Sequence, residues 1–200
     1  MRDYKHLDRY LTTLASDIYP QPGEGDEHPA LSKKVIDTWM SLMTTCKSVL
    51  DVGCGEGIAQ PFFERWGIEY EGVALGADVI KAQELNRNVK KMDFHFLDYP
   101  DSSFDLVFAR HSLEHSPMPL LALMEWERVS RYWLGIVLPA PEWYGYKGIN
   151  HYSVMTHDQI ENLVTRAGWK ILWNDVDRIS KDDQGLVPHE YWYMLEKKGI

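Results

Sequence analysis

Apolar residues recur every three or four positions in two stretches near the start of the chain, which is the spacing of an amphipathic helix. The apolar positions are Leu7, Leu11, Leu14 and Ile18 in the first stretch, and Leu31, Val35, Trp39 and Leu42 in the second. We expect helices over about residues 1–20 and 29–44, with a proline-containing, acidic loop between them. These helices would cap a following sheet; the alternative is that they cover a ligand as a lid.

From residue 48 onward, short apolar runs alternate with helical patterns. The predicted strands lie at residues 48–52, 70–75, 92–96, 105–109 and 134–139, and the predicted helices lie at residues 58–66, 78–85, 117–129 and 156–167. This alternation predicts an α/β domain whose parallel sheet is covered on both faces. Two further strands, at residues 169–176 and 190–196, are joined by a polar loop, so one of them is expected to be antiparallel. We expect an N-terminal helical cap (residues 1–46) and an α/β unit (residues 47–200) within one compact domain.

Composition and charge narrow the class of protein and of partner. The chain has 200 residues, 44% of them hydrophobic, which is enough for one domain with a sizeable core. Its net charge of −9 repels phosphate backbones, which argues against bulk nucleic acid and favours a small-molecule partner. Two cysteines, Cys46 and Cys54, are too few for a disulfide framework. No signal sequence or membrane-spanning run stands out, so we expect a cytoplasmic protein that has no membrane partner and is a monomer or homodimer.

The segment Val49–Gly57 joins an apolar strand to a glycine-rich turn that leads into a helix. Glycines at positions 53, 55 and 57 permit positive φ angles and let a ligand approach the backbone closely. A phosphate-binding P-loop would end in Gly-Lys-Ser/Thr, and no lysine follows Gly57. A dinucleotide-binding fingerprint would have its third glycine where Ile58 stands. The turn therefore predicts a site for a nucleotide-like ligand of another kind.

This turn closely resembles motif I of the class I S-adenosylmethionine-dependent methyltransferases of the type 11-like group. A second stretch, Pro100–Val107, resembles the Pro-Asp-x-Ser-Phe-Asp signature of the same family. The resemblance implies a Rossmann-like, doubly wound, seven-stranded and mostly parallel sheet with one antiparallel strand, to which the two N-terminal helices are added. It also implies an enzyme that transfers a methyl group from S-adenosylmethionine to an N, O or C atom and releases S-adenosylhomocysteine.

The resemblance also assigns residues to the cofactor. The implied cofactor-binding positions are Asp51, Gly53, Cys54, Gly55, Gly57, Ala74, Leu75, Asp93, Phe94 and Arg110. Asp51 would reach the ammonium group of the cofactor, and Asp93 would accept a hydrogen bond from the adenine amine, with Asp98 as the alternative. Ala74 stands where the family has an acid that binds the ribose, and neither Glu71 nor Asp78 is an obvious replacement.

The sequence His111-Ser-Leu-Glu114-His115 allows two interpretations. It satisfies the His-x-x-Glu-His pattern of zinc hydrolases, with His151 or His157 as a third ligand. However, it follows a strand directly and a new helix begins soon after, so the two histidines need not share one face, and we predict no metal. The methyltransferase resemblance instead places this segment beside the methyl donor, with His115, His111 or His151 as a general base. The alternative for each histidine is a structural hydrogen bond.

A long aromatic loop, residues 139–152, follows the fifth predicted strand. Loops of this length in a compact domain tend to be functional, and this one is expected over the carboxyl ends of the strands. Its aromatic residues would form a wall for the methyl acceptor: Trp143, Tyr144, Tyr146 and Tyr152. The alternatives are packing on the N-terminal helices or a dimer contact. Because Ala74 replaces the ribose-binding acid, an alternative for the whole protein is a catalytically weak member of the family that serves as a binding or scaffold module.

Overall fold

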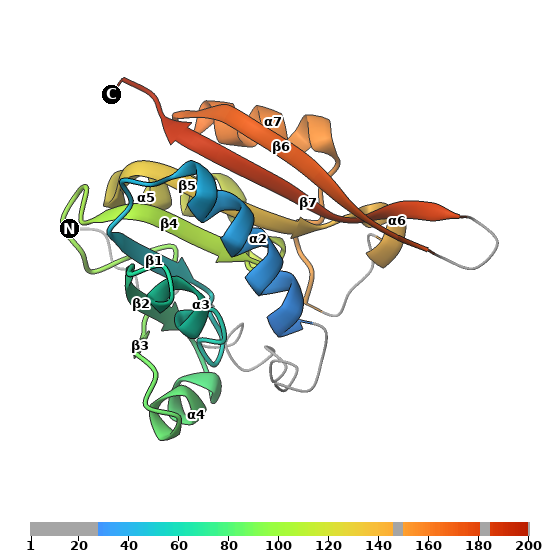
Figure 1. Cartoon of the computed structure of the whole chain (residues 1–200). Coiled ribbons are helices and arrows are strands. Elements are labelled where there is room, and N and C mark those ends of the chain that lie inside the picture. Colours follow the sequence, from blue (N-terminus) through green and yellow to red (C-terminus); the bar gives the residue numbers. More distant parts are fainter. Residues whose placement is uncertain (1–27, 146–149, 181–184, 200) are drawn as a thin grey trace.

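The computed structural model describes residues 28–145, 150–180 and 185–199, and the helix predicted over residues 1–20 lies outside them. A sheet with the strand order β3-β2-β1-β4-β5-β7-β6 runs through the molecule (Figure 1). The strands are β1 Ser48–Val52, β2 Glu69–Ala74, β3 Val89–Lys91, β4 Phe104–Arg110, β5 Ser130–Pro139, β6 Trp169–Ser180 and β7 Leu186–Lys197. Strands β1 to β5 pair in parallel, whereas β7 is antiparallel to both β5 and β6. The predicted seven-stranded sheet with one antiparallel strand is confirmed.

Helices cover both faces of this sheet. They are α2 His28–Leu42, α3 Gln60–Glu64, α4 Asp78–Glu84, α5 Pro119–Val129, α6 Pro141–Tyr144 and α7 His157–Arg166, with a 3-10 turn, η1, at Leu113–His115. Figure 1 shows α2 and α3 on one side of the sheet and α5 and α7 together on the other, and a separate apolar cluster lies under each pair. None of the described helices has the length and apolar character that crossing a membrane requires.

Local sequence signals account for several helix boundaries. The backbone N–H of Thr156 donates to Oε1 of Gln159 at 3.0 Å, which forms one half of a capping box at the start of α7. Gly168, with a φ of +97°, follows the end of this helix in the left-handed conformation that glycine adopts without strain. Pro61 and Pro119 stand in the first turns of α3 and α5, where the missing N–H has no helical partner to lose.

The strand predicted at residues 92–96 is wrong. Only the three residues of β3 pair with β2, in the register Gly72–Val89 to Ala74–Lys91, and the chain then leaves the sheet. Apolar residues follow β3 because the next segment packs on the core as a loop: Met92 and Phe94 lie against the cluster under α5, and the indole N–H of Trp126 donates to the carbonyl of Phe94 at 3.1 Å. The apolar residues at positions 92–96 therefore reflect the packing of a loop on the core, and not a strand.

Helix α2 is fixed to the sheet where the ring of Trp39 lies over Gly135 of β5. A Cβ atom on Gly135 would stand 2.4 Å from Cζ3 of Trp39, so only glycine leaves room for this ring. The ring is fully buried and meets Phe108 edge-on, with centroids 5.8 Å apart. Because buried aromatic rings have little freedom to move aside, this contact sets the distance between α2 and the sheet.

We predict that Gly135→Ala lowers the free energy of unfolding by about 1–3 kcal/mol, the usual cost of adding a methyl group to a filled core. Urea unfolding followed by circular dichroism measures it. Combining it with Trp39→Leu, which removes the obstructing ring, should cost less than the sum of the two single changes. If the changes in unfolding free energy of the two single variants simply added, the contact between Trp39 and Gly135 would not be the cause of the destabilisation.

Candidate functional site

The glycine turn after β1 has the backbone conformation that its sequence predicts. Gly53, Gly55 and Gly57 have φ angles of +69°, +55° and +74°. The space left by two of them is filled by the protein itself: a Cβ on Gly53 would lie 2.6 Å from Oγ of Ser112, and one on Gly57 would lie 2.9 Å from a methyl group of Val89. These glycines therefore let the turn pack against neighbouring elements as well as leaving its backbone open to a ligand.

The carboxyl end of β2 carries no acid. Ala74 is buried there, and its carbonyl accepts a hydrogen bond from the N–H of Met92 at 3.1 Å. The nearby carboxylate of Glu71 is engaged by the hydroxyl of Tyr99 and, at 2.7 Å, by the ammonium of Lys90. Glu71 is thus held by its own contacts, and the structure offers no substitute from that residue for the ribose-binding acid.

Asp93 presents an unused acceptor just after β3, and the ring of its neighbour Phe94 would lie 3.6 Å from a Cβ on Gly53. Its Oδ1 accepts from the backbone N–H of His95 at 2.9 Å and lies 2.7 Å from Nδ1 of the same ring. Its Oδ2 is buried and has no hydrogen-bond partner among the described residues. A buried acceptor in this state costs about 1–3 kcal/mol unless a donor reaches it, so Asp93 fits an amine such as that of adenine. Asp98, the alternative, is exposed.

Asp51, near the end of β1, and Cys54, within the turn itself, are both buried. Burial raises the pKa of Asp51 to about 7, opposed by a hydrogen bond from the hydroxyl of Tyr70 at 2.8 Å and by the charge of Arg110. Asp51 therefore changes its charge near neutral pH. Burial also raises the pKa of the Cys54 thiol well above its ordinary value, which excludes a reactive thiolate in this structure.

A buried ion-pair network joins the end of β4 to β7, and the sequence did not predict it. Oε1 of Glu190 accepts from Arg110 at 2.5 Å and lies 2.9 Å from Nε2 of His111, while its Oε2 accepts from the indole of Trp192 at 2.9 Å. Burial opposes ionisation, but the hydrogen bonds from His111 and Trp192 and the charge of Arg110 hold the pKa of Glu190 below its usual range. The only sequence signal for this network was the position of Glu190 at the start of the apolar strand predicted at residues 190–196.

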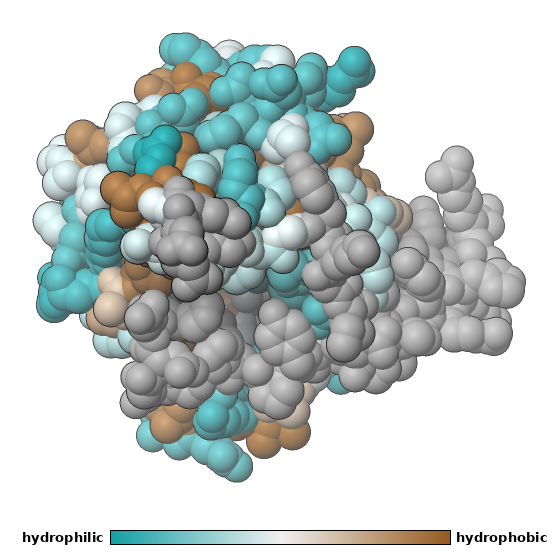
Figure 2. All heavy atoms as spheres, turned by 90° about the vertical axis from the view of Figure 1, so that its right-hand side faces the viewer, coloured by the Kyte–Doolittle hydropathy of each residue, from teal (hydrophilic) through white to brown (hydrophobic). Residues whose placement is uncertain are grey.

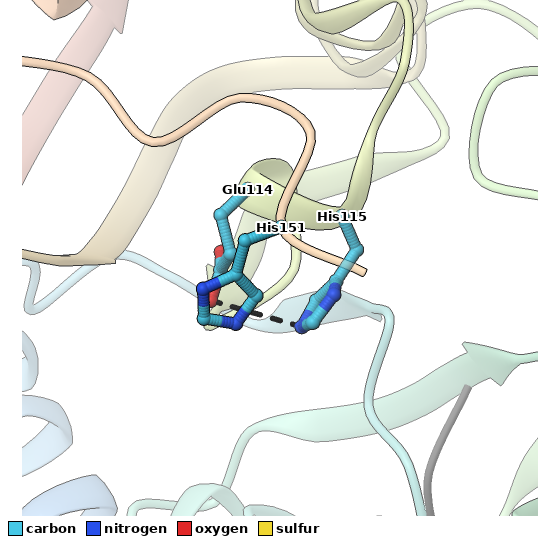
Figure 3. Close-up of side chains that lie close together, drawn as sticks. All are labelled: Glu114, His115 and His151. Carbon is cyan, nitrogen blue, oxygen red and sulfur yellow. Dashed lines mark ion pairs between the residues drawn. The ribbon is translucent and has the colours of Figure 1, made fainter. Parts of the chain in front are cut away.

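Two of the three predicted histidines meet at Glu114 (Figure 3). Ligand atoms of Glu114, His115 and His151 all lie within 4.8 Å of one another, and the two rings are 4.9 Å apart. Burial lowers the pKa of both histidines, so they are neutral at pH 7, and burial raises the pKa of Glu114 to about 8. The ring of His111 lies between two carboxyl groups, with Nε2 2.9 Å from Glu190 and Nδ1 3.6 Å from Glu114. Its Nε2 is thus engaged by Glu190, and His111 is not part of the cluster formed by Glu114, His115 and His151.

The aromatic residues of α6 pack on this region from the side of β7. The hydroxyl of Tyr144 lies 2.9 Å from Nε2 of His189, and its ring is 5.8 Å from that of His111. Trp143 meets His189 edge-on at 5.6 Å, and Tyr152 is exposed beside His151. Tyr146 lies outside the described residues. Tyr144 therefore contacts the histidine segment through its ring, and Tyr152 contacts it through its backbone N–H, which donates to the carbonyl of Glu114 at 2.8 Å.

The site lies at the carboxyl ends of the parallel strands, which is where open α/β sheets bind ligands. Figure 2 looks from that side of Figure 1, and the described residues on this face are mostly hydrophilic, with apolar residues in small groups. The turn after β1, Asp93 after β3, and the histidine segment after β4 all belong to this end of the sheet.

Comparison with known proteins agrees with this arrangement. Residues 50–132 match the model of a methyltransferase domain. A phosphatidylethanolamine N-methyltransferase of Cereibacter sphaeroides is 31% identical over 91 residues, which is 42% of this chain and 45% of that protein. A ubiquinone biosynthesis O-methyltransferase of Coxiella burnetii is 32% identical over 80 residues, which is 36% of this chain and 34% of that protein. The chain thus matches between a third and a half of the length of these relatives.

A solved structure extends the likeness over nearly the whole fold. The SAM-dependent methyltransferase of Archaeoglobus fulgidus superposes with a TM-score of 0.70 at 20% identity, and the match covers 84% of this chain and 94% of that one. At this identity the superposition establishes the fold. The chain is thus similar to methyltransferases in sequence over residues 50–132, and to S-adenosylmethionine-dependent methyltransferases in fold.

Proposed function

We propose that this protein transfers a methyl group from S-adenosylmethionine to a nucleophilic atom of a small-molecule acceptor. The observation that carries the proposal is the buried Oδ2 of Asp93, an acceptor without a partner among the described residues, whose neighbour Phe94 lies against a turn with three left-handed glycines. When bound, the cofactor supplies the methyl group on a sulfonium centre.

The residues of the chain would hold the cofactor in distinct ways. Backbone atoms of Gly53, Cys54 and Gly55 would contact its amino-acid part, and Asp51 would attract the ammonium group through its charge. Asp93 would accept from the adenine amine, and Leu75, half-buried just after β2, would pack on the ring. Positioning of this kind supplies most of the catalysis that a methyl transfer needs.

The acceptor would lie on the histidine side of the site. His115 and His151 are neutral at pH 7 because burial lowers their pKa, so either can accept a proton from an acceptor group. Trp143, Tyr144 and Tyr152 would border the acceptor. The two relatives are named for N- and O-methylation, so the acceptor atom is not fixed by similarity. The net charge of −9 supports a small molecule over bulk nucleic acid, and we propose a cytoplasmic location.

A second candidate function is a scaffold that binds the cofactor weakly, and Ala74 at the end of β2 favours it because the ribose lacks its usual acid. Radiolabelled methyl transfer to a library of acceptors separates the two. Transfer to any acceptor supports the enzyme, whereas measurable cofactor binding without transfer supports the scaffold.

We predict that the protein binds S-adenosylhomocysteine and that Asp93→Ala weakens this binding about tenfold or more, because a hydrogen bond to a charged group contributes about 1.5–3 kcal/mol. Isothermal titration calorimetry measures the dissociation constants of the wild-type protein and of the variant. Asp98→Asn, a change at the exposed neighbouring acid, serves as the control and should leave the affinity unchanged. No binding to the wild-type protein at millimolar ligand would contradict the proposed function.

We predict that Ala74→Asp raises the affinity for S-adenosylhomocysteine by about tenfold or more, because it restores charged hydrogen bonds to the ribose hydroxyls. Ala74→Asn, of similar size but uncharged, is the matched control and should gain less. If both variants fold, as judged by circular dichroism, and neither gains affinity, the ribose lies elsewhere.

We predict that affinity for S-adenosylhomocysteine rises as the pH increases from 6 to 8. Asp51 has a pKa of about 7, so it is mostly protonated at the lower pH and mostly ionised at the higher one. The ligand ammonium, which lies next to the ligand's own carboxylate, titrates above this range and stays charged. Only the ionised form attracts the ammonium. Calorimetry at several pH values tests this. In Asp51→Asn, the affinity should vary less with pH. If it varies as steeply as in the wild-type protein, another group causes the pH dependence.

A further inference from the structure

We propose that Glu114, His115 and His151 bind one divalent cation of the zinc, iron or cobalt kind, and that this cation holds an oxygen atom of the methyl acceptor. The existence of the cation site rests on the geometry of these three residues alone. Its role toward the acceptor rests on the proposed methyltransferase function.

The spacing and chemistry of the three side chains suit one ion. Nε2 of His115 lies 3.9 Å from Oε1 of Glu114, and one ligand atom from each of the three residues lies within 4.8 Å of the others. Two ligands bound at about 2.0–2.2 Å from one ion can stand up to about 4.4 Å apart, so small side-chain rotations suffice. Two imidazoles with one carboxylate favour a borderline transition metal over magnesium or calcium. Three protein ligands leave room for an exogenous oxygen.

Glu114 is a carboxylate that needs a partner. It is fully buried, and neither of its oxygens has a hydrogen-bond partner among the described residues. The two nearest ring nitrogens, Nδ1 of His111 and Nε2 of His115, stand at 3.6 and 3.9 Å, beyond hydrogen-bond reach. The guanidinium of Arg110 is bound to Glu190. A carboxylate buried in this way is costly unless a proton or a cation compensates it, and Figure 3 shows it directed toward His115 and His151.

Hydrogen bonds around the cluster prepare it for a cation. Nδ1 of His115 lies 2.9 Å from the carbonyl of Asn150, so this nitrogen carries the hydrogen and Nε2 keeps its lone pair toward Glu114. A metal-binding histidine is commonly oriented in this way by a backbone carbonyl. The backbone N–H groups of Tyr152 and Ser153 donate to the carbonyl of Glu114 at 2.8 and 2.9 Å. These bonds fix the segment that carries His151 against η1, so the third ligand is held in place from a distant part of the chain.

A cation here would determine the acceptor class. When His115 and His151 bind the cation, neither serves as the base. A hydroxyl group that binds the cation through oxygen instead becomes more acidic and loses its proton to solvent. The oxygen lone pair then forms the new bond to the methyl carbon while the carbon–sulfur bond breaks, and its electron pair stays on sulfur. The products are a methylated oxygen and a neutral thioether, and no oxidant or reductant is needed. We therefore assign phenol, enol or carboxylic acid acceptors to the site.

Metal titration of the full chain tests the site. After treatment with a chelator, the protein should bind one equivalent each of Zn²⁺ and Co²⁺ in competition with one another, and Co²⁺ should develop visible absorption from nitrogen ligation. His151→Ala and Glu114→Gln should each weaken binding at least tenfold. His157→Gln is the matched control, because that ring contacts the hydroxyl of Tyr193, outside the cluster, and it should bind as the wild type does.

The outcomes separate the cation site from the proposed function. Saturable binding that His151→Ala does not weaken, or no binding of either cation, would overturn the site. Because His151 is only partly buried, its variant should fold even if Glu114→Gln does not, and unchanged S-adenosylhomocysteine binding confirms that it has. Cation binding without S-adenosylhomocysteine binding would leave the site standing and remove the methyltransferase function. Acetohydroxamate, a small oxygen ligand, should shift the Co²⁺ absorption, and an unchanged spectrum would overturn the acceptor role.

Discussion

The contact between Gly53 and Ser112 connects the two halves of the site. Ser112 occupies the space that a side chain on Gly53 would take, and its hydroxyl donates to the carbonyl of Val52 at 2.8 Å. The turn after β1 is thereby fixed to the segment that follows β4. Since Glu114 and His115 follow Ser112 by two and three residues, the distance between the proposed cofactor and acceptor positions depends on this glycine. Gly53 thus has a structural role that a ligand-contact explanation alone would not reveal.

The buried charge of Glu190 directs the histidine segment. His111 has a φ of +51°, an uncommon conformation for a residue other than glycine, and its ring is held by Glu190 on β7. Its Nε2 is engaged by Glu190 at 2.9 Å, although its Nδ1 lies only 3.6 Å from Glu114. The contact with Glu190 thus occupies one ring nitrogen of the first histidine of the inverted zinc pattern. His151, from another part of the chain, joins Glu114 and His115 in the cluster instead.

The sequence predicted the features that are encoded locally. The alternation of elements, the glycine turn and the capping box at Thr156 all depend on neighbouring residues, and the structure agrees with them. The strand at residues 92–96 failed because apolar residues packing a loop on Trp126 have the same spacing as those of a strand. The network at Glu190 and the pairing of Glu114 with His151 join residues that are distant in sequence. No local pattern reports such contacts.

The two sides of the site place different demands on the chain. The proposed cofactor side relies on backbone geometry and one unpartnered acceptor at Asp93, so we expect the lack of an acid at Ala74 to lower affinity for the cofactor without affecting the fold. The acceptor side concentrates ionisable side chains in a buried space, where each needs a partner. Arg110 and His111 satisfy Glu190, whereas neither oxygen of Glu114 has a hydrogen-bond partner among the described residues. The buried carboxyl group that lacks such a partner thus lies on the proposed acceptor side of the site, where the proposed cation would compensate it.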